Sequence, residues 1–271
     1  MSLRRVWTLL ILLAIIALGG WLYRDARPVA LNDADAQTLR VARQLYQTGQ
    51  TAEAAAMLQQ LADSGVTSAE VYYNLGTVYQ VLGDHASAIY YLRLAHALAP
   101  RDPDIQANLN IARSEIDAPP PRDDALQQVL RLVEANLSLD ETALIALGLW
   151  LAFALLILIT GALRRGVLRG LLRFVMLLVG IATLAAALVF GVRIYYELTE
   201  PPAVIVMPNV HPRPAIDGEA NTRISLPPGS EVRVMQLEDG WARITLPGSQ
   251  VQGWIPALAL RPLSPFYNIS I

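Results

Sequence analysis

The sequence predicts a multidomain membrane protein with an all-α repeat region, membrane-spanning helices and a C-terminal all-β module. Three observations predict this class. Residues 33–116 carry a repeat with a period of 34 residues, two long apolar segments follow, and residues 203–262 consist of short β-type runs separated by turns. The chain has 271 residues, 54 % of them hydrophobic, which leaves room for two small soluble modules beside the membrane segments.

Composition narrows the classes of function. A net charge of −2 gives no electrostatic reason to expect a nucleic-acid partner. The absence of cysteine excludes disulfides and thiol nucleophiles. His85, His96 and His211 have no second ligand at helical spacing, so we expect no metal site and interpret His85 and His96 as surface residues. Because nucleotide-binding and nucleophile motifs are also missing, we expect a non-enzymatic protein without a cofactor.

The N-terminal residues 1–23 form the first apolar segment. Arg4 and Arg5 precede an uncharged run from Val6 to Leu22. Such a run is typical of a signal anchor or of a signal peptide. Its length favours a retained anchor, and a cleaved signal peptide stays the alternative.

The repeat region has the register of helix–turn–helix units. Residues 34 apart match in type at Gly49 and Gly83, Ala54 and Ala88, and Leu58 and Leu92. This period is the tetratricopeptide signature. In the copy that begins at Ala69, we expect Gly76 and Ala88 to be small where two helices cross, Gly83 to form the turn, and Pro100 to end the second helix.

A candidate peptide-binding groove follows from this register. In tetratricopeptide folds the first helix of each repeat lines a concave surface, and Asn74 and Asn108 lie one period apart on that helix. An asparagine amide can donate to and accept from a peptide backbone. Our hypothesis is that Asn74 and Asn108 clamp an extended segment of a partner while Arg43 supplies charge. The alternative is that these asparagines have no ligand role. The same predicted face carries three more residues, Tyr46, Tyr73 and Thr77.

Residues 117–140 are predicted to be a linker and an amphipathic helix. Prolines stiffen residues 117–124, and an apolar stripe then follows at Leu126, Val129, Leu130 and Val133. This helix either lies on the membrane surface or packs on the repeats. Ser138 and Glu141 have the spacing of a capping box.

Residues 144–192 are predicted to be a transmembrane hairpin. Leu144–Leu163 and Phe174–Val192 contain no ionisable residue, and the loop 164–173 between them holds four arginines. Arginine-rich loops stay in the cytoplasm. We therefore expect a multi-pass protein of the bacterial inner membrane, with the repeats and the β module on the extracytoplasmic side.

The C-terminal residues 203–262 predict a small β-barrel. Strand-like runs lie beside Gly240-Trp241 and Gly253-Trp254, at the spacing of a short-stranded all-β module. With Pro228-Gly229, these pairs resemble a bacterial SH3-like domain. Trp241 and Trp254 are candidates for a ligand groove on it, or for its core. We favour the core for Trp254 and leave Trp241 open.

The order of repeats, hairpin and SH3-like module resembles the BatE-type proteins of bacterial aerotolerance operons. The strings 108–113 and 137–140 also resemble that group. The resemblance implies an accessory protein of an oxidative or envelope stress system, whose partners are membrane proteins with von Willebrand A domains and, indirectly, a MoxR-type AAA+ ATPase. We therefore expect a membrane-anchored interaction scaffold. The alternative is an envelope receptor that binds peptidoglycan or peptides through the SH3-like module.

Overall fold

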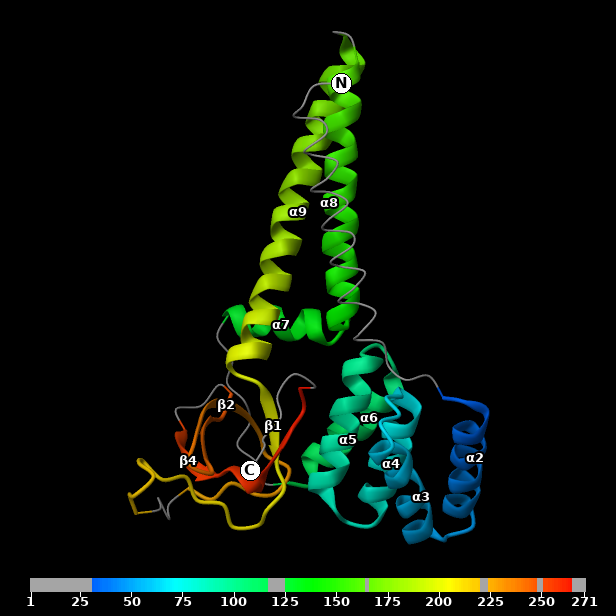
Figure 1. Cartoon of the computed structure of the whole chain (residues 1–271), viewed down its shortest axis with the longest axis vertical. Helices are drawn as coiled ribbons and strands as arrows, with labels where there is room; N and C mark the ends of the chain where they lie inside the picture. Colours follow the sequence, from blue (N-terminus) through cyan, green and yellow to red (C-terminus); the bar gives the residue numbers. More distant parts are fainter. Residues whose placement is uncertain (1–30, 117–124, 164–165, 220–223, 248–250, 265–271) are drawn as a thin grey trace.

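The computed structural model describes residues 31–116, 125–163, 166–219, 224–247 and 251–264. The expected N-terminal anchor at 1–23 and the proline linker at 117–124 lie outside these residues. Figure 1 shows a long helical hairpin, with the helical repeats and the β module side by side at its base. Both soluble parts therefore lie at the end of the hairpin opposite to its tip.

The predicted repeat architecture is confirmed. Helices α2 (Asp33–Gln47) and α3 (Thr51–Asp63) form one pair, α4 (Ala69–Val81) and α5 (His85–Leu98) form a second, and α6 (Pro103–Ser114) is the first helix of a third copy. Gly49 and Gly83 turn the chain within each pair at φ values of 83° and 78°, which glycine adopts without strain.

The crossing of α4 and α5 depends on small residues, as the sequence predicts. A Cβ atom at Gly76 would lie 2.6 Å from Leu92 Cγ and 3.1 Å from the Ala88 carbonyl oxygen. Leu75, Leu92 and Ala88 are fully buried around this crossing. The close approach of the two helices is therefore possible only because position 76 lacks a side chain.

The hairpin consists of α8 (Leu139–Ala162) and α9 (Val167–Thr199), and the short α7 (Ala125–Glu134) precedes it. Both α8 and α9 are long and apolar enough to cross a bilayer. The predicted capping box at Ser138 and Glu141 is present. The expected arginine-rich loop 164–173 is wrong in extent, because α9 already begins at Val167 and contains Arg169 and Arg173.

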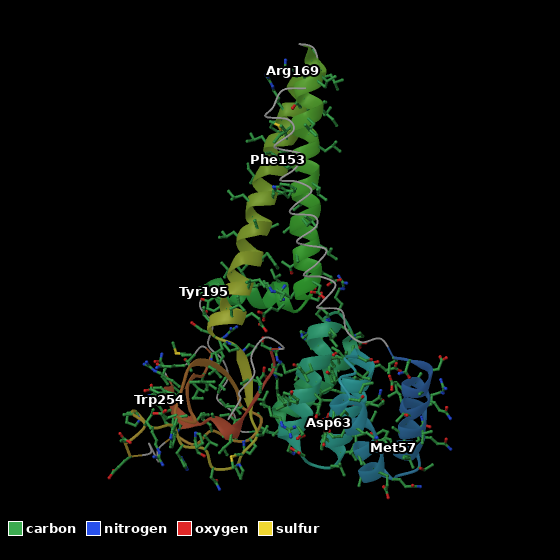
Figure 2. All side chains as sticks on the ribbon, in the orientation of Figure 1. Met57, Asp63, Phe153, Arg169, Tyr195 and Trp254 are labelled. Carbon is green, nitrogen blue, oxygen red and sulfur yellow. The ribbon has the colours of Figure 1, made fainter. Side chains whose placement is uncertain are left out.

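Polar and close apolar contacts hold the hairpin together. A Cβ at Gly180 would lie 2.9 Å from Phe153 Cε2, so the ring of Phe153 in α8 packs directly on the α9 backbone (Figure 2). At the base, Arg193 of α9 donates hydrogen bonds to the carbonyl oxygens of Leu137 and Ser138, at 3.2 and 3.3 Å. A cation there satisfies carbonyls of the turn between α7 and α8.

The β module is one antiparallel sheet. Its strands are β1 (Pro202–Ile205), β2 (Glu231–Glu238), β3 (Trp241–Thr245), β4 (Gln252–Pro256) and β5 (Leu260–Pro262), in the order β4-β3-β2-β1-β5. The predicted all-β module is thus present as an antiparallel sheet, but the predicted barrel is not, since the sheet is not closed and β4 and β5 are its two edges. Its own core includes Ile205, Ile244 and Ile255.

The sheet docks on the end of the repeat stack through one row of residues. In the sheet register Val204 of β1 lies opposite Glu231 of β2 and Arg261 of β5. Val204 is fully buried among Leu109 and Ala112 of α6. Beside this row, a Cβ at Gly229 would lie 2.9 Å from Ile89 Cδ1 of α5.

Each soluble part is also attached to its own helix of the hairpin. Arg101, which precedes α6, forms an ion pair with Glu141 at the start of α8. Arg233 of β2 donates a hydrogen bond of 3.2 Å to the carbonyl oxygen of Glu200, and its guanidinium lies 5.2 Å from the Tyr196 ring centre. The repeats are therefore attached to α8 and the sheet to α9.

We expect Gly76→Ala to destabilise the protein, although alanine favours a helix by about 1 kcal/mol. The new methyl group would displace the buried Leu92 and separate α4 from α5, at a cost of about 1–3 kcal/mol. Thermal unfolding of the detergent-solubilised full chain measures this. Gly191→Ala in α9, where nothing lies within 4 Å, is the matched control. Equal melting temperatures for the two variants would contradict the tight crossing.

Candidate peptide-binding groove and the neighbouring cleft

The six residues predicted for the groove lie on the first helices of the three repeats. Two come from α2, three from α4 and one from α6, and each of them is half-buried. They are Arg43, Tyr46, Tyr73, Asn74, Thr77 and Asn108. None of the six residues is fully buried and none is fully exposed. Such partial burial suits side chains that keep a defined orientation while they contact a ligand.

A chain of hydrogen bonds joins α4 to α6 on this face. The Asn108 Nδ2 group donates to Thr77 Oγ1 at 3.0 Å, and the Thr77 hydroxyl donates to the Tyr73 carbonyl oxygen at 2.8 Å. The Asn108 amide is thereby held in one orientation. Its oxygen accepts no hydrogen bond from any described residue and remains available to a donor.

The second asparagine is held by its own helix. Asn74 Nδ2 donates to the Glu70 carbonyl oxygen at 2.6 Å, one turn earlier in α4. The carboxylate of Glu70 forms an ion pair with Arg43 of α2, and the two side chains are 49 % and 43 % exposed. Arg43 therefore already has an acidic partner. Because exposed pairs are weak, an acidic group of a ligand can compete with Glu70 for it.

Sequence reasoning missed Glu70, because its contact with Arg43 joins two different repeats. Only a superposition of neighbouring first helices could have indicated it. The two tyrosines also have structural roles: Tyr46 packs on the core of the first two helix pairs, and Tyr73 on the cluster around Leu109.

Trp241 and Trp254 lie on the sheet face that points away from its core. Both are half-buried, and the preferred core position of Trp254 is wrong, because the alternating Gly253 and Ile255 are the buried residues of β4. The Arg213 guanidinium lies 4.6 Å from the Trp241 ring centre. Figure 2 shows Trp254 on the side of the sheet away from the repeats, so the structure does not unite the tryptophans with the groove.

A cleft of about 1000 Å³ lies between the end of the repeats, α7 and the sheet. Its polar centre is Glu231, whose carboxylate forms ion pairs with Arg93 Nε at 3.0 Å and with Arg113 Nε at 2.6 Å. Burial acts to raise the pKa of Glu231, but the two arginines outweigh it and hold the pKa below its usual range. On the other side of the docking row, the Arg261 guanidinium lies 5.5 Å from the Tyr90 ring centre.

His96 also lines this cleft, contrary to its expected place on the surface. Burial, with Arg93 and Arg113 nearby, lowers the pKa of His96 to about 4. This cluster was not predictable from the sequence, because Arg93 and His96 of α5 and Arg113 of α6 lie on the surface of the repeats that a further repeat helix would ordinarily cover. Here the sheet covers it instead.

Comparison with known proteins supports the repeat assignment. Residues 69–102, which comprise α4 and α5, match the tetratricopeptide repeat family model. Searches of curated proteins and of solved structures found no significant match to the chain. The helical repeats point to a role in protein interaction.

We expect the free energy of unfolding of the protein to decrease as the pH falls from about 6.5 towards about 4. The folded protein holds the His96 pKa at about 4, against 6.5 for a free imidazole, so only the unfolded chain takes up the proton in this range. The loss is about 1–2 kcal/mol after allowance for solvent screening. Thermal unfolding at pH 7 and pH 4.5 measures it. His96→Gln should remove this part of the pH dependence, whereas His85→Gln at the start of α5 should not. An unchanged pH profile in His96→Gln would contradict the assignment.

Proposed function

We propose that this protein is a membrane-anchored, non-enzymatic scaffold that holds an extended segment of a partner protein in its repeat groove. The single observation that carries the proposal is the pair of oriented asparagine amides, Asn74 and Asn108, one repeat apart on the first helices. The match to the tetratricopeptide model supports a protein-binding role, and the two apolar helices support the anchor.

The groove binds through hydrogen bonds to the ligand backbone. Each asparagine already donates one N–H within the repeats, so its amide oxygen accepts an N–H from the bound chain. Side chains that are oriented beforehand lose little conformational freedom on binding. Arg43 then exchanges Glu70 for an acidic side chain of the partner.

Charge and the arrangement of the hairpin support the proposed location. Arginines at the tip of the hairpin keep that tip in the cytoplasm, so both soluble parts face the outside of the bacterial inner membrane. The resemblance to BatE-type proteins supports membrane proteins with von Willebrand A domains as the direct partners. A MoxR-type AAA+ ATPase then belongs to the same stress system and is reached through them.

The double variant Asn74→Ala, Asn108→Ala should retain about tenfold less of the partner. The loss of two hydrogen bonds to a peptide backbone, each worth about 0.5–1.5 kcal/mol, corresponds to this factor. Affinity purification of the full chain from its native membrane in mild detergent, with quantitative mass spectrometry, measures retention. Asn110→Ala is the matched control, because Asn110 lies on α6 but borders the cleft. Unchanged retention in the double variant would show that the asparagines do not clamp the partner.

A second candidate function is an envelope receptor that binds peptidoglycan or peptides through an SH3-like module. The favouring observation is the partly exposed Trp241, with the Arg213 guanidinium over its ring, on the same sheet face as Trp254. Pairing of β1 with both β2 and β5 brings the two ends of the module together, as in a small barrel.

Sedimentation of the full-length protein with purified cell walls separates the two functions. Under the scaffold proposal we expect no binding above that of a wall-free control. A receptor would sediment with the walls, and Trp241→Ala would lower the bound fraction severalfold because an aromatic anchor is lost. Leu258→Ala, another exposed apolar residue of the same module, is the control for nonspecific adhesion.

A further inference from the structure

We infer that α7 lies flat in the outer interfacial layer of the bilayer, with one apolar face inserted among the lipids. Its partner is therefore the lipid surface beside the hairpin. The inference rests on the proposed crossing of that bilayer by α8 and α9. It concerns a different surface from the peptide groove, and it fixes where the soluble parts sit relative to the membrane.

The orientation of α7 is the first argument. Figure 1 shows α7 running across the base of the hairpin, crosswise to α8 and α9. Only four residues separate Glu134, the end of α7, from Leu139, the start of α8. The turn is tight, because the amides of Asn136 and Leu137 both bond to the Val133 carbonyl oxygen, at 3.1 and 2.7 Å. If α8 crosses the bilayer, a helix held in this way lies parallel to the membrane surface, at the level where α8 enters the bilayer.

The two faces of α7 differ in what they meet. Gln128, Leu132, Glu134 and Ala135 border the cleft, with Leu130 buried at its edge. Val129 does not border the cleft, and it is 51 % exposed although it is large and apolar. A helix of ten residues is also marginal by itself in water, so an environment that buries the face of Val129 stabilises it.

Markers of the membrane interface lie at the same level. Tyr195 and Tyr196 of α9 pack edge to face with ring centres 5.8 Å apart, and Figure 2 places Tyr195 at the height of α7. Tyrosine is enriched where lipid headgroups meet the hydrocarbon. The Arg193 guanidinium binds the turn that follows α7, so a cation is fixed at the same depth. An apolar helix face beside tyrosines and an arginine suits the interfacial layer.

Spin labels attached to single cysteines test the inference, and a chain without native cysteine makes each label unique. Val129→Cys places a label on the face away from the cleft. Leu132→Cys, also large, apolar and exposed but bordering the cleft, is the matched control, together with Gln128→Cys. The full chain is reconstituted in vesicles of phosphatidylethanolamine and phosphatidylglycerol. The accessibility of each label to oxygen and to a water-soluble nickel chelate is then measured by electron paramagnetic resonance.

We expect the ratio of oxygen to nickel accessibility to be severalfold higher at position 129 than at positions 128 and 132. Equal ratios would overturn the inference. A label at 129 shielded from both reagents would also overturn it, because α7 would then pack on protein. Leu155→Cys in α8 and Leu184→Cys in α9 test the anchor itself, since both side chains are exposed on the hairpin. If these two report lipid while position 129 reports water, only the α7 inference fails. If all of them report water, the proposed anchoring fails as well.

Discussion

The row formed by Glu231, Val204 and Arg261 is the contact on which the arrangement of the soluble parts depends. A stack of helical repeats ends in a surface that must be covered, because each repeat relies on its neighbour to bury its apolar side. Here Val204 enters the apolar end of the stack, Glu231 pairs with two arginines beside it, and Arg261 lies over Tyr90. One face of a small sheet thus replaces the helix that would continue the solenoid.

This contact between the sheet and the repeats explains why β1 is apolar along its whole length. A strand with one solvated face alternates apolar and polar residues, whereas Ala203, Val204 and Ile205 are all buried. Ala203 and Ile205 belong to the core of the sheet, and Val204 belongs to the repeats. The unbroken apolar run at 203–205 was therefore the one signal in the sequence that the module has a second buried face.

What the sequence predicted well were features decided within one element or one repeat. The period of 34 residues fixed the helix pairs, Gly76 and Gly83 marked the crossing and the turn, and Ser138 with Glu141 located the start of α8. Glu231, His96 and Arg113 come from three segments far apart in the chain. No spacing rule connects them, so neither the cleft nor the shifted pKa of His96 was predictable. Trp254 was misplaced because a strand register decides which of two adjacent residues faces inward.

The separate attachment of each soluble part to one helix of the hairpin has a mechanical consequence. The repeats are joined to α8 through Arg101 and Glu141, and the sheet is joined to α9 through Arg233, Glu200 and Tyr196. The two soluble parts meet again at Glu231, so α8, α9, the repeats and the sheet form a closed loop of four connected bodies. A slide or rotation of α8 against α9 would therefore also shear the sheet against the repeats. Movement of the repeats would in turn reach the packing of Phe153 on Gly180 inside the hairpin.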